Sequence, residues 1–120
     1  MDNKTNINEL KAQVKKFCDD RDWDQFHNAK ELAIAMNIES SELLEHFRWK
    51  NPEEVAALLK NPQKKEEIQD EMADVLYFLL RIAQMNDIDL SDALENKLHK
   101  NNQKYPVEKF KGSHKKYNEI

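Results

Sequence analysis

Residues 68–83 read Ile-Gln-Asp-Glu-Met-Ala-Asp-Val-Leu-Tyr-Phe-Leu-Leu-Arg-Ile-Ala, a stretch without glycine or proline. Its apolar side chains recur every three or four residues, which is the spacing of one face of an α-helix. On a helical wheel Glu71 falls within that face and Asp74 lies at its margin. The stretch therefore predicts a long helix, over roughly residues 63–86, that directs a pair of carboxylates toward a core.

A second helix, expected from about residue 29 to residue 47, repeats this feature. Leu32, Met36 and Leu43 mark its apolar stripe. Glu39 lies in the middle of that stripe, and Glu42, one turn further on, borders it. Two helices thus each offer two acids spaced three residues apart to the same interior.

The rest of the chain predicts further helices over residues 6–21, 52–60 and from about 90 to 104. Asn6, Asn51 and Asn61 are expected N-caps, and Asp89 or Ser91 is expected to cap the last helix. With one glycine and three prolines, the chain cannot turn as often as a β-sandwich or barrel requires. We therefore expect an all-α protein: a four-helix bundle with a short extra helix and a C-terminal tail over 107–120, forming a single domain over residues 1–120.

Charge and composition exclude several classes of protein. The net charge is −4, and residues 93–120 carry +4 of their own, which leaves −8 on residues 1–92. This acidic surface argues against a nucleic-acid partner, and no run of 18 apolar residues predicts a membrane span. Cys18 is the single cysteine and no apolar leader begins the chain, so a reducing, cytoplasmic location is expected.

Four inward carboxylates repel one another unless something compensates their charge. Oxygen-only ligands favour a hard divalent cation, Mg²⁺ or Mn²⁺ rather than Zn²⁺. No glutamate has a histidine three residues later, which argues against a di-iron site. The alternatives are that these acids pair with basic residues across an interface or reach solvent.

Several motifs resemble, in order, those of the all-α nucleotide pyrophosphohydrolases of the MazG type, and within them the dCTP pyrophosphatase-like branch. Glu39–Glu42 and Glu71–Asp74 match the E-x-x-E and E-x-x-D metal motif of that family, with 28 residues between them. Similar motifs extend over nearly the whole chain: Arg21-Asp22-Trp23-Asp24-Gln25-Phe26-His27, Phe47-Arg48-Trp49, and Lys97, Asn101, Lys104, Tyr105 and Pro106.

The resemblance implies hydrolysis of a nucleoside triphosphate to a monophosphate and pyrophosphate. Glu39, Glu42, Glu71 and Asp74 would then hold Mg²⁺, or alternatively Mn²⁺, and one of them could instead activate the attacking water. Lys97 and Lys104 would neutralise charge on the leaving pyrophosphate, and Asn101 and Tyr105 would donate hydrogen bonds. Arg48 and Arg81 are expected at the surface or at an interface.

Large aromatic side chains lie in or beside the expected loops. Trp23, Phe47 and Trp49 either complete the core or form a stacking slot for a nucleobase, with His27 bonding the base edge. The resemblance favours dCTP or a modified pyrimidine deoxynucleotide as substrate. Wide apolar arcs favour a self-complementary homodimer, and the resemblance implies a dimer of dimers as the alternative. A helical interaction module, or a metal-binding bundle without hydrolytic activity, stays open as an alternative.

Overall fold

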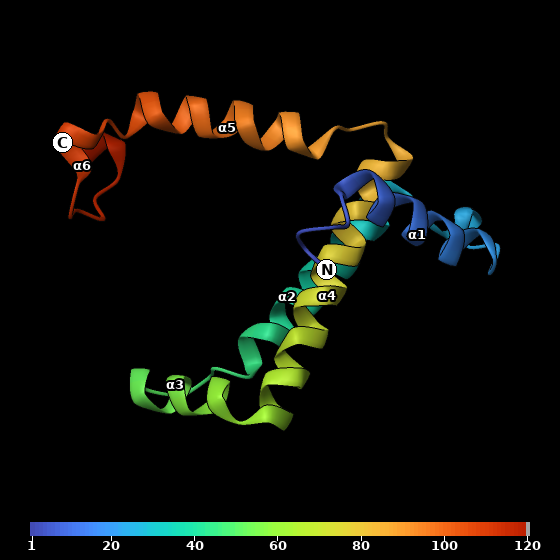
Figure 1. Ribbon diagram of the computed structural model, residues 1–120, viewed down its shortest axis with the longest axis horizontal. Coiled ribbons are helices and arrows are strands. Elements are labelled where there is room, and N and C mark those ends of the chain that lie inside the picture. Colours follow the sequence, from blue (N-terminus) through green and yellow to red (C-terminus); the bar gives the residue numbers. More distant parts are fainter. Residues whose placement is uncertain (120) are drawn as a thin grey trace. The chain divides into compact units, whose positions relative to one another are not determined.

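The computed structural model describes residues 1–119 and confirms the all-α prediction, since no strand occurs among them (Figure 1). The chain divides into two compact units, Met1–Asp87 and Ile88–Ile120. The first unit holds α1 (Ile7–Asp19), η1 (Asp24–Phe26), α2 (Ala29–Glu45), α3 (Pro52–Lys60) and α4 (Pro62–Met85), and the second holds α5 (Leu90–Lys104), α6 (Val107–Phe110) and η2 (Tyr117–Glu119).

The helices begin where the sequence predicts, because each predicted cap is made by a side chain close by in the chain. Asn6, Asn51 and Asn61 each accept a hydrogen bond from the backbone N–H three residues on. Asn51 also completes a capping box with Glu54, whose carboxylate accepts from the Asn51 backbone N–H at 3.2 Å. Of the two candidates for α5, Asp89 is the cap.

The C-terminal tail differs from the sequence prediction, which gave it little periodicity. It contains one helical turn, α6, which follows Pro106, and the short 3₁₀ turn η2. Within this second unit Tyr105 contacts Phe110 and Tyr117 edge to face, with ring centroids 4.9 and 6.2 Å away. An aromatic cluster thus holds this segment together, and helical periodicity cannot reveal such a cluster.

In the first unit α4 is the central helix: α1, α2 and α3 all pack against it. Figure 1 shows α2 and α4 running side by side over most of their length. The buried side chains come from three helices: Cys18 of α1, Leu32 of α2, and Ile68, Leu80 and Ala83 of α4. Packing on several sides explains why α4 is apolar over much more than one face.

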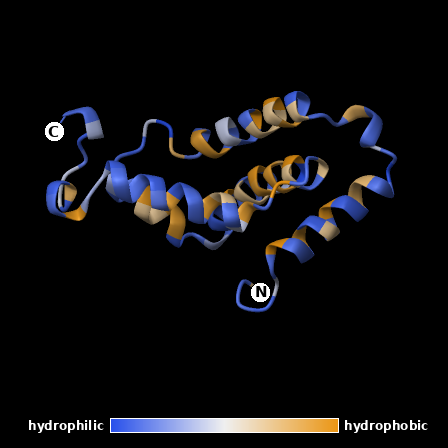
Figure 2. Cartoon of the chain, turned by 90° about the horizontal axis from the view of Figure 1, so that it is seen from above, coloured by the Kyte–Doolittle hydropathy of each residue, from blue (hydrophilic) through white to orange (hydrophobic). Residues whose placement is uncertain are grey.

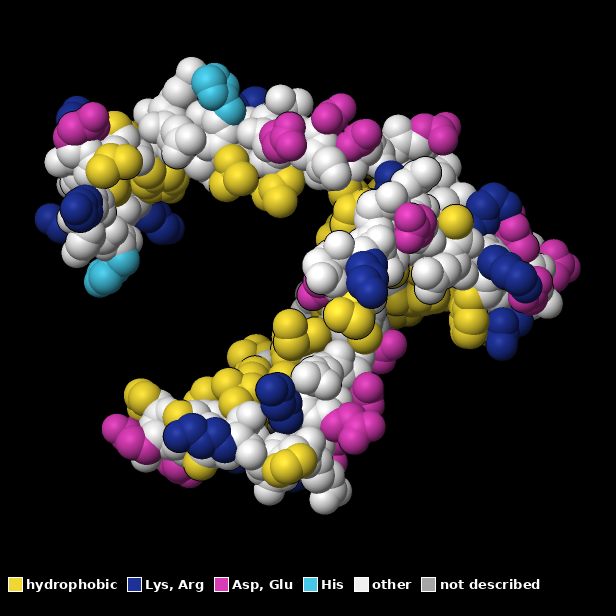
Figure 3. All heavy atoms as spheres, viewed as in Figure 1, with side chains coloured by type: hydrophobic (Ala, Val, Ile, Leu, Met, Phe, Trp, Pro, Cys, Tyr) yellow, Lys and Arg dark blue, Asp and Glu magenta, His cyan; other side chains and the backbone are white. Residues whose placement is uncertain are grey.

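Apolar side chains also remain at the surface. Each long helix carries hydrophobic and hydrophilic residues on different sides (Figure 2), and hydrophobic side chains gather along α2 and α4 on the face seen in Figure 3. Ile34, Ile38, Leu44, Met72 and Leu76 are exposed in the first unit, and Leu94 and Leu98 in the second. Among residues 1–119, no helix has the length and apolarity needed to span a membrane.

Candidate metal centre and ligand cavity

Three of the four predicted metal ligands meet between α2 and α4. Glu39, Glu42 and Glu71 each place a carboxylate oxygen within 4.8 Å of the others. Glu39 and Glu42 lie one turn apart on α2, and the side-by-side packing of α4 brings Glu71 opposite them. The arrangement follows from the three-residue spacing of each acidic pair together with the pairing of the two helices.

Burial and neighbouring carboxylates raise the pKa values of Glu39 and Glu71, so the protein does not fully compensate the negative charge of this cluster. Burial and the neighbouring Glu42 raise the pKa of Glu39 to about 7, and Asp74 and Glu71 add to this effect. Burial and Glu42 also raise the pKa of Glu71. Carboxylates that repel one another in a partly dry place favour protonation, or a cation that neutralises them.

Two oxygens of the cluster lack any hydrogen-bond partner within residues 1–119. They are Oε2 of Glu39 and Oε2 of Glu71, and both are buried. A buried carboxylate oxygen without a donor is costly. Such oxygens, in an oxygen-only cluster, fit a hard divalent cation, so the residues present satisfy the chemistry that Mg²⁺ or Mn²⁺ requires.

His46, which caps the C-terminal end of α2, is a further neighbour of the cluster that the sequence did not single out. Its Nε2 lies 3.9 Å from Oε1 of Glu71, and both side chains are largely buried. His46 lowers the pKa of Glu71, although burial and Glu42 outweigh it. The signal available in the sequence was its position four residues after Glu42, one turn further along the same helix face.

Asp74, the fourth predicted ligand, lies one turn beyond Glu71 and is exposed. It is not part of the three-carboxylate group but lines a cavity of about 400 Å³ between α1 and α4. The other lining residues are Gln13, Val14, Phe17, Trp23, Ala73 and Tyr77. Asp74 therefore lies both one helical turn from Glu71 of the acidic cluster and in the lining of a mostly apolar cavity.

A second cavity, of about 290 Å³, adjoins the first and shares Trp23 and Tyr77 with it. Phe26, His27 and Phe78 complete its lining. Trp23 contacts Phe17 and His27 edge to face, with ring centroids 5.6 and 6.0 Å away. The predicted base-binding residues Trp23 and His27 thus lie together beside the cavities.

Tyr77 lines both cavities, and the sequence left open whether Tyr77 or Phe78 replaces the tyrosine contact that the family resemblance implies. Its hydroxyl lies 3.1 Å from Sγ of the buried Cys18, and its ring meets Phe17 and Phe78 edge to face. Burial raises the pKa of the Tyr77 hydroxyl, which therefore stays protonated. The Cys18 contact fixes the ring as a wall of the two cavities.

The other two predicted aromatic contacts lie elsewhere in the first unit. Trp49 is 87% exposed and has a positive φ of 63° in the turn after α2, where the Arg48 guanidinium lies 5.0 Å from its ring centroid. Phe47 is half-buried in the same turn. Neither residue lines the cavities around Trp23, so the structure does not bring Trp23 and Trp49 together as a slot.

The predicted phosphate-binding residues belong to the second unit. Lys97, Asn101 and Lys104 lie on α5, and Tyr105 is its C-cap. Lys97 and Lys104 are exposed, and Nζ of Lys104 lies 5.1 Å from the centroid of the Tyr117 ring. Lys97, Asn101 and Lys104 are three or four residues apart, so they lie near one another on this helix.

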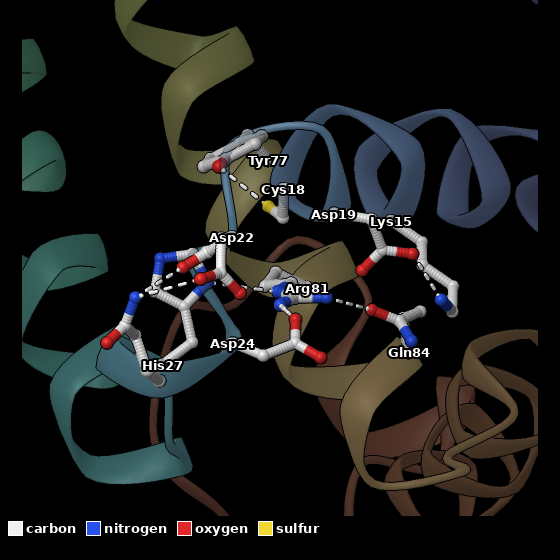
Figure 4. A network of polar contacts seen from close by, with 10 residues as sticks. Lys15, Cys18, Asp19, Asp22, Asp24, His27, Tyr77, Arg81 and Gln84 are labelled. Carbon is white, nitrogen blue, oxygen red and sulfur yellow. Dashed lines mark hydrogen bonds and ion pairs between the residues drawn. The ribbon is translucent and has the colours of Figure 1, made fainter.

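Arg81 was expected at the surface or at an interface, and the structure excludes the surface. Arg81 is 1% exposed and its guanidinium bonds Asp24, His27 and Gln84 (Figure 4). It lies on the side of α4 that carries Asp74 and Tyr77, away from the apolar stripe on which the helix was predicted. Arg48, by contrast, is exposed as expected and pairs with Glu45 at 3.5 Å.

Comparison with known proteins places this architecture in a family. The family model described as "MazG-like family" matches residues 34–120. The chain is 33% identical to dCTP pyrophosphatase 1 of Rattus norvegicus over 114 residues, which is 95% of this chain and 67% of that protein. It is 32% identical to dCTP pyrophosphatase 1 of Homo sapiens over the same length, with the same shares of each chain.

A solved structure supports the same assignment. The crystal structure of a pyrophosphatase from Archaeoglobus fulgidus matches with a TM-score of 0.78 and 37% sequence identity, over 83% of this chain and 92% of that chain. The family model and the curated relatives together cover both acidic pairs described above. This chain belongs to the MazG-like family.

Proposed function

We propose that this protein, a nucleotide pyrophosphatase and thus a hydrolase, converts dCTP or a modified pyrimidine deoxynucleoside triphosphate to the monophosphate and pyrophosphate with the help of Mg²⁺. Such an activity removes surplus or altered nucleotides from the pool. We propose that residues 1–120 act as one functional domain and that the protein works in the cytoplasm, as its lone cysteine favours.

One observation carries the proposal: a carboxylate cluster with two unpartnered buried oxygens lies one turn of α4 from Asp74, which lines a mostly apolar cavity. A nucleoside triphosphate joins an apolar base to a highly charged phosphate chain. Asp74 belongs to the cavity lining and also acts on the pKa of Glu39. The base and the phosphates of one ligand therefore find suitable surroundings side by side.

The cluster itself would repel a triphosphate. Glu39, Glu42 and Glu71 are the residues that would hold Mg²⁺, with Asp74 at the edge. Bound Mg²⁺ supplies the positive charge that attracts the phosphates, and Mn²⁺, with the same preference for oxygen, is expected to substitute. In the reaction, water adds its oxygen to phosphorus, the bridging bond between the α and β phosphates breaks, and a proton is released.

The basic residues of the second unit complete the proposal. Lys97 and Lys104 carry charge that would offset the charge developing on pyrophosphate as it leaves. Asn101 and Tyr105 can donate hydrogen bonds to phosphate oxygens. In this interpretation Lys97→Ala and Lys104→Ala reduce kcat more than they raise KM, because the charge they meet develops in the transition state.

For the base, we propose stacking on Trp23, with His27 bonding the base edge. Stacking on an aromatic side chain contributes about 1–3 kcal/mol of binding free energy, whichever base is bound. Phe47 and Trp49 are proposed to contact the nucleotide as well, from the turn after α2. Trp23→Ala is expected to raise KM for every triphosphate, whereas exposed Phe26→Ala, at the rim of the smaller cavity, serves as a milder control.

Product analysis tests the proposal directly. The protein should be incubated with a panel of nucleoside triphosphates, with Mg²⁺, with Mn²⁺ and with a chelator, and the products separated. Monophosphate and pyrophosphate in equal amounts are expected, with dCTP or a modified relative preferred and no turnover under chelation. Release of diphosphate and inorganic phosphate would contradict cleavage between the α and β phosphates. Equal kcat/KM for dCTP, dTTP and purine triphosphates would contradict the pyrimidine preference alone.

A further inference from the structure

Each of the three nitrogens of the Arg81 guanidinium donates a hydrogen bond. Its Nε donates to Nδ1 of His27 at 3.0 Å, Nη1 donates to Oε1 of Gln84 at 2.6 Å, and Nη2 donates to Oδ1 of Asp24. Arg81 stands on α4, whereas Asp24 and His27 belong to the segment around η1, more than fifty residues earlier (Figure 4). This one buried side chain therefore fastens the segment that carries Trp23 and His27 to the central helix.

The bond to His27 determines where the histidine carries its proton. A guanidinium nitrogen is a donor and never an acceptor in proteins, so Nδ1 of His27 must offer its lone pair. A neutral imidazole has one N–H, which is then on Nε2. In a protonated ring the N–H at Nδ1 of His27 would face the Nε–H of Arg81. Burial, and with it the charge of Arg81, lowers the pKa of His27.

The other edge of the ring has no partner in the part of the chain that the structure describes. No hydrogen bond from Nε2 of His27 occurs there. His27 lines the smaller cavity with Trp23, Phe26, Tyr77 and Phe78, and among these four side chains the one hydroxyl, that of Tyr77, is paired with Cys18. The cavity thus has aromatic walls, and two N–H groups of its lining, Nε2–H of His27 and the indole N–H of Trp23, lack an acceptor among the described residues.

We infer that Arg81 is a positioning residue that fixes His27 as an Nε2–H donor, so that the site selects ligands presenting a hydrogen-bond acceptor on the edge of the base. This inference rests on the proposed function, and it adds the direction of the hydrogen bond and the residue that sets it. Cytosine offers acceptors at its ring N3 and its 2-carbonyl oxygen. A base that turns a donor toward His27 is rejected, because two N–H groups would face each other.

The tautomer can be measured without any substitution. Nitrogen NMR of the labelled histidine rings in the unmodified protein is expected to show the His27 proton on Nε2 and a bare Nδ1 at neutral pH. A proton on Nδ1, or a doubly protonated ring, overturns the inference. Arg81→Met should release the restraint and give a mixture of tautomers, whereas Gln84→Met removes another partner of Arg81 and should leave the His27 signals unchanged.

Two substitutions at position 27 separate the two edges of the ring. In His27→Asn the side-chain oxygen can still accept from Arg81, but nothing reaches the ligand; in His27→Gln a donor can still reach the position of Nε2. We expect His27→Asn to raise KM for dCTP about tenfold, the value of one lost hydrogen bond, with little change in kcat. His27→Gln should recover most of that loss. Equal KM values for the two variants overturn the inference.

Arg81→Met should raise KM for dCTP severalfold and weaken the preference over dTTP, while Gln84→Met keeps both. Thermal melting of each variant separates loss of folding from loss of positioning, and if Arg81→Met does not fold, the tautomer of the unmodified protein and the two His27 variants decide. Failure of the unmodified protein to hydrolyse any triphosphate overturns the proposed function and the base selection together, whereas the tautomer result still decides the role of Arg81.

Discussion

Glu39 lies on the apolar stripe of α2, and its Oε2 has no hydrogen-bond partner within residues 1–119. Glu39→Gln should therefore lower turnover at least about 100-fold, because a direct ligand matters more than an outer-shell partner, whose loss costs about 10–100-fold. The metal-free variant should be as stable as the parent protein or more stable, since a mutual repulsion disappears. Glu45→Gln, on the same helix but at the surface, is the matched control and should change neither quantity. Full activity of Glu39→Gln would contradict its role as a ligand.

The raised pKa of Glu39 predicts how stability depends on pH in the absence of metal. Its pKa is about 7 in the folded protein, against an ordinary value of 4.5, so the folded state binds the proton more tightly. This contribution is fully present below pH 4.5 and is lost as the pH rises through about 7. His27, whose pKa is lowered, acts in the opposite direction.

Urea unfolding with a chelator, at a series of pH values, isolates the effect of Glu39. The difference in free energy of unfolding between the parent protein and Glu39→Gln should change with pH between 4.5 and about 7, in favour of the variant at the higher pH. A difference that is independent of pH would show that Glu39 does not titrate in this range.

At the scale of the helix, α4 determines the stability of the first unit because three other helices pack against it. Leu80 is 2% exposed on α4, and Leu76, one turn earlier, is 41% exposed. Leu80→Ala should lower the free energy of unfolding by about 3 kcal/mol, from lost burial and the cavity left behind, and Leu76→Ala by less than about 1 kcal/mol. Chemical denaturation of both variants measures this contrast, and equal losses would contradict the central position of α4.

The N-terminal ends of the long helices are determined by residues close together in the sequence, whereas the short C-terminal turns are not. Asn51 meets Glu54 within one turn, so the spacing Asn-Pro-x-Glu was sufficient to predict α3. The turn α6 has four residues, too few for a period of 3.6 to show, and the contact of Tyr105 with Phe110 accompanies it. Spacing rules therefore predict long, capped helices and miss single turns held by aromatic contacts.

For the whole molecule, we expect a homodimer or a dimer of dimers. Both units leave apolar side chains exposed, and Leu44 of α2 is 68% exposed. A second copy of the chain would bury such a surface, which is unusual for a monomer. Light scattering at micromolar concentration should give twice or four times 14.3 kDa, and Leu44→Glu should shift the mass downward. A mass of 14.3 kDa for the parent protein would contradict the prediction.

The sequence by itself determined the long helices, most of their caps and the inward direction of Glu39 and Glu71, because each depends on residues within one or two turns of each other. Family motifs also predicted Trp23 and His27 as base-binding residues. The tertiary structure decided that Glu71 joins Glu39 and Glu42 while Asp74 faces the cavity. It also decided that Arg81 is buried against His27, 54 residues away. Helical periodicity determines which face of its helix a side chain occupies. Which residue that side chain contacts depends on how helices distant in the sequence pack together.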